Sequence, residues 1–517
     1  MFRNILSVGG FTLLSRLAGF VRDVVMAAVL GAGPVAEAFL IAFRLPNHFR
    51  AIFAEGAFNA AFVPTYARLR QEDGTPAARH FADEILAGMT AVHVVLLVLA
   101  LGFTPQFVGL LAPGLVDDPF RFDLAVTLTR ITFPYLALIS LATLVTGALN
   151  ASERFAVAAA APILLNVSMV GTLLAASLFP TAGHAAAWGV LIAGVAQLAV
   201  VGADAERAGI GLRFAMPRLD PGTRQFLKAL GPAIIGSAGV QIALFADTII
   251  ATFLPAGALP ALYYADRINQ LPVGVVGIAV GTVLLPEMAR RLAAKDDTGA
   301  AQAQARAVEL ATVLGIPFVA ASLVVPDLVM RALFARGAFS AADAASAAAT
   351  LRAYGVGLLA FVVVRAFIAP FHARGDTRTP MIASLSAVAL HLAPKPLLMN
   401  PPAQVGLALA TAVGAWLNVG LLVAFARRAG YPVGDAALAG HLARLGGVLV
   451  VTAAALYGAH RLAEAVIPAG MPGREEAMLL LVVVIGAVVY GAAVLGLLGR
   501  GFVAGLAGRR RLRGPAA

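Results

Sequence analysis

Long apolar runs, separated by short stretches that contain Gly, Pro or Arg, occupy most of the chain. One of them extends from Leu479 to Leu498 without a charged side chain. A helix needs about 20 apolar residues to cross the hydrocarbon core of a bilayer. The pattern therefore predicts about fourteen transmembrane helices, at residues 5–30, 35–62, 81–103, 124–149, 157–179, 185–203, 230–253, 259–285, 308–330, 350–371, 381–398, 404–426, 442–460 and 476–499.

The overall composition supports a membrane protein. Of the 517 residues, 60% are hydrophobic and 13% are charged, and the mean hydropathy is +0.88. Soluble domains contain roughly 45–50% apolar and 25% charged residues, so a soluble, a disordered and a peripheral membrane protein are excluded. A transmembrane barrel is disfavoured, because it requires short segments in which apolar and polar residues alternate. We predict an all-α polytopic membrane protein.

The basic residues carry topological information. The formal net charge is +11, from 38 Lys and Arg against 27 Asp and Glu. These charges lie in short loops between apolar segments, which favours retention of positive loops in the cytoplasm over a nucleic-acid partner. With the amino terminus placed inside, about three times as many Lys and Arg fall on the inner side as on the outer side. Both termini are therefore expected in the cytoplasm, and the basic tail Arg509–Arg513 is expected to contact anionic membrane lipids.

Short sequence matches recur at an offset of about 222 residues. Val63–Arg68 and Leu285–Arg290 share Pro, Ala and Arg at equivalent positions, and Arg130 matches Arg352. This offset spans six predicted helices, an even number, so the two halves would have the same orientation in the membrane. A parallel repeat of this kind is typical of transporters.

The repeat predicts the domain organisation. Two six-helix parallel-repeat lobes would occupy residues 1–222 and 223–444, and two extra helices with a basic tail would occupy residues 445–517. The chain has no cysteine and no phosphate-binding loop, and His48, His93, His372 and His391 share no metal-ligand spacing. We therefore expect a transporter rather than an enzyme, with no metal and no cofactor.

Charged residues inside the predicted spans mark candidate functional positions. An Arg at the bilayer centre costs roughly 2.5–3.5 kcal/mol unless it faces water or an acidic partner. The basic residues of this set are Arg16, Arg22, Arg44, Arg50 and Arg267, and the acidic ones are Asp23, Glu37, Glu55 and Asp266. Converging guanidinium groups suit a phosphate or diphosphate. Structural salt bridges, or ion pairs that act as gates, explain the same residues.

The spacing of these arginines suggests interrupted helices. Arg16 and Arg22 are six residues apart, which places them about 120° apart around a regular helix, with Gly19 between them. Arg44 and Arg50 repeat this spacing around Pro46. Broken helices often line the substrate sites of transporters, so we expect kinks or unwinding at these positions.

Several of these stretches closely resemble one family of bacterial exporters. The stretches read SRLAGFVRD over Ser15–Asp23, FRLPN over Phe43–Asn47, IFAEGAF over Ile52–Phe58 and YYADR over Tyr263–Arg267. They are similar to the MurJ (MviN) family of lipid II flippases, which belongs to the multidrug/oligosaccharidyl-lipid/polysaccharide (MOP) exporter superfamily. The resemblance covers essentially the whole chain, and fourteen spans arranged as six, six and two are also that family's plan.

The resemblance implies a function and a site. Such proteins move lipid II, an undecaprenyl-diphosphate-linked peptidoglycan precursor, from the inner to the outer leaflet of the bacterial cytoplasmic membrane by alternating access. It implies substrate-binding roles for Arg16, Arg22, Arg50 and Arg267, and gating or orienting roles for Asp23, Glu37, Glu55 and Asp266. The two extra helices would hold the lipid tail, and the cell-wall synthesis machinery is the implied protein partner.

Ion coupling is the point at which the chain departs from the family pattern. Some members use a sodium site with a carboxylate in the seventh span, which Asp247 matches, and polar ligands in the eleventh and twelfth spans. Thr411 and Asn418 are candidates in the twelfth span, but residues 381–398 contain no Asp or Asn. Coupling to a monovalent ion, to protons or to the membrane potential stays open.

Two other functions fit the same pattern. A related MOP exporter of another polyprenyl-linked glycan or of a drug would share the architecture. A non-transporting scaffold for cell-wall assembly would tolerate the loss of Arg267 with normal precursor traffic.

Overall fold

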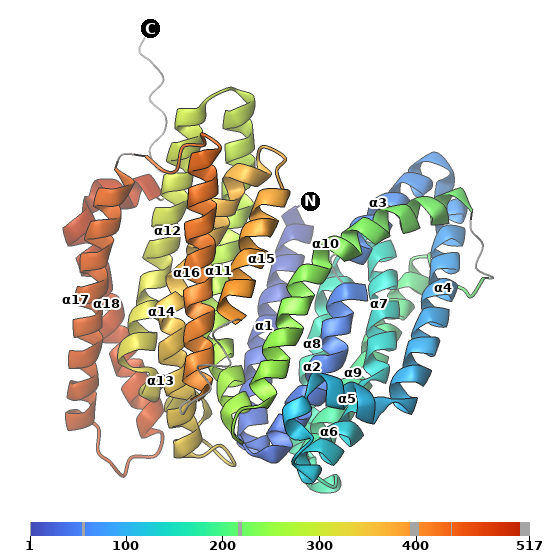
Figure 1. Cartoon of the computed structure of the whole chain (residues 1–517), viewed down its shortest axis with the longest axis horizontal. Coiled ribbons are helices and arrows are strands. Elements are labelled where there is room, and N and C mark those ends of the chain that lie inside the picture. Colours follow the sequence, from blue (N-terminus) through green and yellow to red (C-terminus); the bar gives the residue numbers. More distant parts are fainter. Residues whose placement is uncertain (1, 54–56, 216–219, 393–402, 436, 507–517) are drawn as a thin grey trace. The chain divides into compact units, whose positions relative to one another are not determined.

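The computed structural model is all-helical in every part of the chain that it describes, namely residues 2–53, 57–215, 220–392, 403–435 and 437–506 (Figure 1). These residues form eighteen α-helices and two short 3-10 helices. They separate into two compact units. The first comprises Met1–Pro260 with Arg336–Phe339, and the second comprises Ala261–Ala335 with Ser340–Ala517.

The first unit contains ten α-helices in its described residues. They are α1 (Phe2–Leu30), α2 (Pro34–Phe53), α3 (Ala57–Glu72), α4 (Gly74–Gly102), α5 (Thr104–Leu111), α6 (Pro119–Thr132), α7 (Pro134–Ala151), α8 (Ala156–Leu174), α9 (Ala182–Arg207) and α10 (Pro221–Thr252). An aromatic cluster joins α3, α4 and α10. The Phe62 ring stacks on Phe58 and Phe81 at 5.3 and 5.5 Å, and the Phe226 ring meets all three edge-on.

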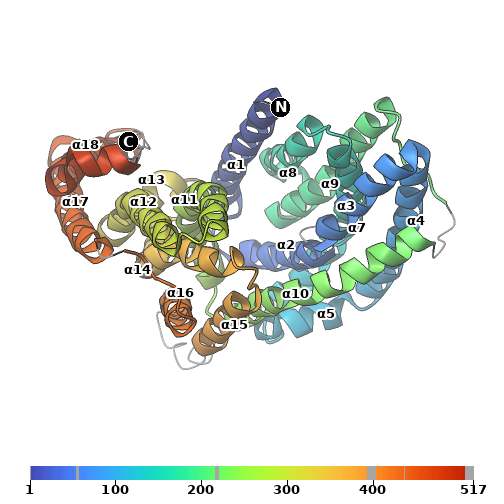
Figure 2. The same cartoon turned by 90° about the horizontal axis from the view of Figure 1, so that it is seen from above.

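The second unit contains the remaining helices. They are α11 (Ala258–Ala293), α12 (Asp297–Val324), α13 (Pro326–Phe334), α14 (Ala341–His372), α15 (Arg378–Leu392), α16 (Ala403–Arg428), α17 (Leu438–Val466) and α18 (Arg474–Leu506). One hydrophobic core of this unit is formed by small and branched side chains of α11, α12 and α14, such as Val280, Ala311 and Leu358. The last two helices lie side by side (Figure 2), and they pack on α12 and α13 through Leu456, Met478 and Val482.

The helix boundaries recur at the offset found in the sequence. The starts of α5, α6 and α8 lie 222 residues before the starts of α13, α14 and α15. The pairs of first residues are Thr104 and Pro326, Pro119 and Ala341, and Ala156 and Arg378. The starts of α4 and α9 correspond to those of α12 and α16 at nearly the same offset. This regularity supports the predicted six-helix repeat, with α17 and α18 outside it.

The compact units are not the same divisions as the predicted repeats. The first unit extends to Pro260, well beyond the predicted boundary at residue 222. The physical reason is that α10 packs on α2, α3 and α4 through side chains such as Phe226. The division of the chain into lobes 1–222, 223–444 and 445–517 therefore stays a proposal about the repeat.

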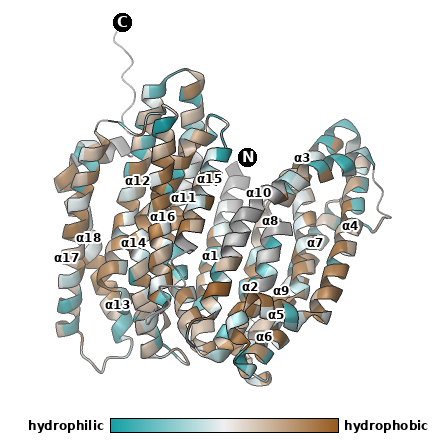
Figure 3. Cartoon of the chain, viewed as in Figure 1, coloured by the Kyte–Doolittle hydropathy of each residue, from teal (hydrophilic) through white to brown (hydrophobic). Residues whose placement is uncertain are grey.

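The described residues contain nine segments that are long and apolar enough to cross a membrane. They are α4, α6 with α7, α8, α9, α12, α14, α16, α17 and α18. Outward-facing side chains such as Val98 on α4 and Val488 on α18 are about two-thirds exposed, at 65% and 67%, as expected for surfaces that contact lipid. Apolar residues run along these helices in Figure 3. The chain is thus a multi-pass membrane protein.

The predicted spans at 5–30, 35–62, 230–253, 259–285 and 381–398 are not among these nine. Helix α1 has the length of a span but carries Arg16, Arg22 and Asp23. Residues 35–62 form parts of two helices, α2 and α3, with residues 54–56 outside the described structure. The total of about fourteen spans stays a prediction.

Candidate functional site

Arg22 is held in a buried polar contact between α1 and α8. The residue is only 8% exposed, and its Nη2 lies 2.7 Å from Asp23 Oδ1. Its Nη1 donates a hydrogen bond of 3.1 Å to Asn166 Oδ1. The Asn166 amide in turn donates to the Ser15 carbonyl at 3.1 Å. One asparagine of α8 therefore fixes both a guanidinium group and the backbone of α1.

Arg16 lies in a different setting, in the wall of a cavity of about 370 Å³ within the first unit. Helix α1 contributes Arg16 to this wall, and α7 and α8 supply most of the rest. The lining residues are Thr12, Ser15, Arg16, Thr146, Asn150, Phe155, Ala158, Ala159 and Pro162. No carboxylate is among them, and Arg16 has no ion-pair partner among the residues that the structure describes. The cavity is positively charged and is lined with hydroxyl and amide groups, which suits an anion.

Helix α1 positions these two arginines without an interruption. It is one continuous helix from Phe2 to Leu30, so the break expected at Gly19 is absent. A glycine destabilises a helix by only about 1 kcal/mol relative to alanine, and the contact with α8 along α1 compensates for it. Because the helix is regular, residues six apart face about 120° apart. This accounts for the separate surroundings of Arg16 and Arg22.

The other two predicted substrate-binding arginines, Arg50 and Arg267, lie on α2 and α11. Arg50 is half-buried near the end of α2, and its Nε donates to Asn47 Oδ1 at 2.9 Å. Helix α2 continues through Pro46 to Phe53, so the expected unwinding there is also absent. In the second unit, the Arg267 guanidinium lies over the Tyr263 ring, 4.7 Å from its centroid.

The acidic residues of the set have varied partners. Asp23 pairs with Arg22, and Asp266 accepts a hydrogen bond from Gln270 on the same helix. Glu37 is 1% exposed. Its Oε2 lies 3.1 Å from Arg121 Nε, an ion pair without the alignment of a hydrogen bond, and its Oε1 accepts from the Gly257 amide at 2.7 Å. Glu55 lies outside the described residues.

The predicted site residues therefore fall into both units. Arg16, Arg22, Asp23, Arg50 and Glu37 belong to the first unit. Arg22 and Asp23 form an ion pair on α1, whereas Arg16 on the same helix lines the cavity instead. Arg267 and Asp266 belong to the second unit. The convergence of all four arginines on one substrate stays a prediction.

The candidate ion ligands also lie in both units, with Asp247 in the first and Thr411 and Asn418 in the second. Asp247 is half-buried on α10, in the first unit. On α16, the Thr411 hydroxyl donates to the Leu407 carbonyl at 3.0 Å, and the Asn418 amide nitrogen lies 3.4 Å from Ser384 Oγ. Asn418 Oδ1 is buried and accepts no hydrogen bond from the described residues. The ion site stays a prediction.

Three residues around this site were not identified from the sequence. They are Asn166, Asn150 and Arg121, each of which contacts or lines a predicted position. The signal for Asn166 was available, because an amide in the apolar segment 157–179 needs a polar partner. Arg121 gave no such signal, since it precedes the predicted span at residues 124–149, and basic residues are common outside spans.

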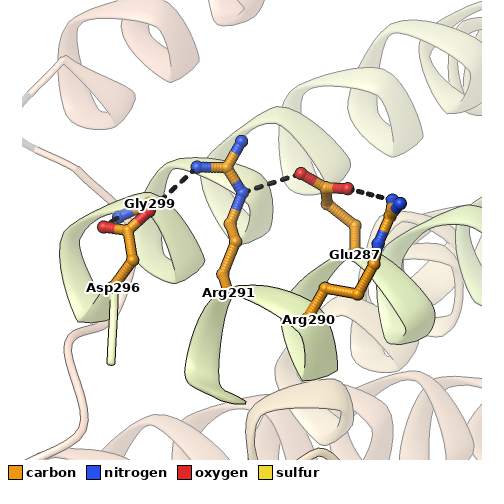
Figure 4. Close-up of polar contacts among 5 residues, drawn as sticks. All are labelled: Glu287, Arg290, Arg291, Asp296 and Gly299. Carbon is orange, nitrogen blue, oxygen red and sulfur yellow. Dashed lines mark hydrogen bonds and ion pairs between the residues drawn. The ribbon is translucent and has the colours of Figure 1, made fainter. Parts of the chain in front are cut away.

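A polar network closes the end of α11, at the repeated Pro-containing motif (Figure 4). Glu287 Oε1 accepts from Arg291 Nε at 2.7 Å, and its other oxygen pairs with Arg290 at 2.5 Å. Arg291 also reaches Asp296, which caps α12 by accepting from the Gly299 amide at 2.7 Å. The hydrogen bond from Arg291 lowers the pKa of Glu287 below its ordinary value of 4.5. This network ties α11 to α12 within the second unit.

Comparisons with known proteins agree over nearly the full length. The family model described as lipid II flippase MurJ matches residues 26–471. A protein of Rhizobium meliloti named probable lipid II flippase MurJ is 44% identical over 463 residues, covering 88% of this chain and 86% of the relative. The lipid II flippase MurJ of Burkholderia cenocepacia is 32% identical over 435 residues, covering 83% and 84%.

Solved structures share the fold. A lipid II flippase MurJ in an inward closed conformation superposes with a TM-score of 0.79 at 21% identity, covering 96% of this chain and 99% of that one. An inward-facing multidrug resistance MATE family transporter of the MOP superfamily gives a TM-score of 0.69 at 14% identity, covering 82% and 97%. The match over residues 26–471 and the 44% identical relative show that the chain belongs to the MurJ family of lipid II flippases.

Proposed function

We propose that this protein moves lipid II from the inner to the outer leaflet of the bacterial cytoplasmic membrane. The observation that carries the proposal is the match to the lipid II flippase family over residues 26–471, together with a relative that is 44% identical. The chain's own geometry adds a cavity with an arginine and without a carboxylate in its wall.

Arg16 is the residue that we assign to first contact with the diphosphate. A guanidinium group donates paired hydrogen bonds to phosphate oxygens, and charge-assisted hydrogen bonds are roughly twice as strong as neutral ones. Ser15, Thr146 and Asn150 in the same wall supply further polar groups. Arg22, which is hydrogen-bonded to Asn166, holds α1 beside this wall. Arg50 and Arg267 are the other two cations of the proposed set.

Transport would proceed by alternating access between the two six-helix lobes. Asp23, Glu37, Glu55 and Asp266 are assigned orienting or gating roles. Helices α17 and α18 lie outside the repeat and carry exposed side chains such as Val483 and Val488, which suits a groove for the polyprenyl tail. Both termini face the cytoplasm in this arrangement, because that placement keeps most Lys and Arg inside.

The driving force follows from the charge of the cargo. A diphosphate carries negative charge, and an inside-negative membrane potential favours outward movement by about 2.3 kcal/mol per charge per 100 mV. The potential therefore contributes to net export without a cofactor. Asp247, Thr411 and Asn418 remain the candidates for coupling to a monovalent ion. Lipid II and membrane lipids are the proposed partners, with the cell-wall synthesis machinery as the proposed protein partner.

A binding experiment tests the role of the cavity. Purified protein in detergent is titrated with undecaprenyl diphosphate and, separately, with undecaprenyl monophosphate. We expect tighter binding of the diphosphate, and a loss of affinity of about tenfold or more in Arg16→Ala, since hydrogen bonds to charged groups contribute about 1.5–3 kcal/mol.

The matched control is Arg427→Ala, which removes an exposed arginine at the end of α16. It should leave the affinity unchanged. Equal losses in the two variants, or none in either, would show that the cavity of Arg16 does not receive the diphosphate.

A further inference from the structure

A second cluster of ionisable groups lies in the first unit, away from the cavity of Arg16. His80 and Glu84 are four residues apart on α4 and so share one face of the helix. Asp220 is the N-cap residue of α10. One ligand atom from each of the three residues lies within 4.8 Å of the other two. A histidine and two carboxylates thus meet where α4 faces the start of α10.

Glu84 is the unusual member of this cluster. The residue is only 2% exposed. Its Oε2 accepts a hydrogen bond of 2.9 Å from the Thr223 hydroxyl. Its Oε1 is fully buried and accepts no hydrogen bond from any residue that the structure describes, although His80 Nε2 lies 3.4 Å away. A buried carboxylate oxygen without a donor costs free energy, and this oxygen is the one that lies beside His80.

We propose that His80, Glu84 and Asp220 bind a divalent transition-metal ion of the Zn²⁺ class. One imidazole nitrogen and two carboxylate oxygens are a ligand set that such ions accept, whereas Mg²⁺ and Ca²⁺ favour oxygen ligands alone. Two carboxylates supply two negative charges against the two positive charges of the ion. The His80 side chain is 57% exposed, so a fourth position is open to water.

The site would act on the connection between the two repeats. Residues 208–220 lead from α9 to α10, and α4 already holds this connection at a second point, where Asp83 Oδ1 accepts from the Arg213 amide at 2.6 Å. An ion held by α4 and by the N-cap of α10 would fix the place at which the second repeat begins. Such an ion site is independent of the proposed transport function.

A shared proton is the competing explanation for the same geometry. A protonated Glu84 could donate to Asp220 and satisfy the two carboxylates without a metal. The two explanations differ in what His80 contributes, because only the metal site needs an imidazole nitrogen.

Metal titration of the full-length protein separates them. The purified chain is treated with a chelator, dialysed, and titrated with Zn²⁺ while binding and the melting temperature are recorded. The absence of cysteine in the chain limits competing sites to histidines and carboxylates. We expect one tight equivalent of Zn²⁺, a higher melting temperature with the ion, and an absorption spectrum typical of low-symmetry coordination when Co²⁺ replaces it.

The variants are chosen so that the fold survives. His80→Ala alters an exposed side chain, and Asp220→Asn keeps a residue that caps helices well. Each should weaken Zn²⁺ binding by about tenfold or more and abolish the shift in melting temperature. The control is His184→Ala, which removes a histidine on α9. It should keep both the Zn²⁺ affinity and the shift in melting temperature. Absence of a tight equivalent in the unaltered protein, or its retention in His80→Ala and Asp220→Asn, would overturn the proposal.

Discussion

At the scale of single residues, Asn166 determines how α1 is held beside α8. Asn166 makes two hydrogen bonds with α1, one to the Arg22 guanidinium and one to the Ser15 carbonyl. Ser15 and Arg16 line the cavity. A single amide therefore links the buried Arg22 to the wall that we assign to the diphosphate.

Replacement of Asn166 tests this link. Asn166→Ala leaves Arg22 with one partner fewer in a buried position, where a hydrogen bond to a charged group is worth about 1.5–3 kcal/mol. We expect lipid II export to fall by about tenfold at matched protein abundance. Ser168→Ala, a substitution on the same helix, should have little effect. Equal export by Asn166→Ala and the unaltered protein would show that Asn166 does not position α1 for transport.

Glu287 gives a pH-dependent prediction. Its pKa lies below the ordinary value of 4.5 because Arg291 donates a hydrogen bond to the carboxylate. A lowered pKa in the folded state means that the stabilisation is present above pH 4.5 and is lost as the pH falls through the folded value. Glu287→Gln should lower the melting temperature at pH 7, and its difference from the unaltered protein should shrink below pH 4.5. A difference independent of pH would contradict the assignment.

The sequence indicated which charged residues lie in apolar segments, but it did not indicate their partners far along the chain. Arg16, Arg22 and Asp23 were singled out from the sequence, because charges in apolar segments are conspicuous, and their roles stay predictions. Glu37 was expected among gates or orienting groups, but nothing indicated Arg121, the residue with which Glu37 pairs. Pairing between residues far apart in the chain follows from helix packing, which hydropathy does not specify.

At the scale of elements, helix packing is set by small residues at close contacts. A Cβ atom added to Gly357 on α14 would lie 2.6 Å from Ala412 Cα on α16, so the two backbones approach each other here. Gly420, also on α16, has open space where a Cβ would lie. The two glycines allow one substitution to be compared in two settings.

Gly357→Ala should destabilise the second unit, because the new methyl group meets backbone that cannot rotate away. Overpacking of this kind costs typically about 1–3 kcal/mol. Gly420→Ala should be neutral or stabilising, since alanine favours a helix by about 1 kcal/mol over glycine. The melting temperatures of the two purified variants decide the point. A Gly357→Ala variant as stable as Gly420→Ala would contradict the close packing of α14 on α16.

Hydropathy predicted the long helices and missed the short ones. Helices α4, α8, α9, α12, α14, α16, α17 and α18 all lie at predicted spans. The short helices α5 and α13 escaped notice, because a short helix beside a longer apolar run adds no separate peak. The repeat was proposed from a few matched residues, such as Arg130 and Arg352, and several helix starts recur at nearly the same spacing.

At the scale of the whole molecule, the predicted topology can be read with single cysteines. The chain contains none, so each introduced thiol reports only its own position. Gln71→Cys lies in a predicted cytoplasmic segment and Gly470→Cys in a predicted outer one, and both positions are exposed. We expect a membrane-impermeant maleimide to label Gly470→Cys in intact cells and Gln71→Cys only after permeabilisation. Labelling of both in intact cells would contradict an even number of spans between the amino terminus and residue 71.

The proposed transport depends on arginines that carry the diphosphate of lipid II to the outer leaflet. The most informative experiment follows lipid II exposed on the outer leaflet with a membrane-impermeant probe, in cells that depend on this protein. The unaltered protein is compared with Arg22→Ala and Arg267→Ala at matched abundance. We predict that exposure collapses in both variants while precursor accumulates in the inner leaflet. Unchanged exposure would mean that transport needs neither Arg267 nor the contact of Arg22 with α8, and that the diphosphate is carried by other groups.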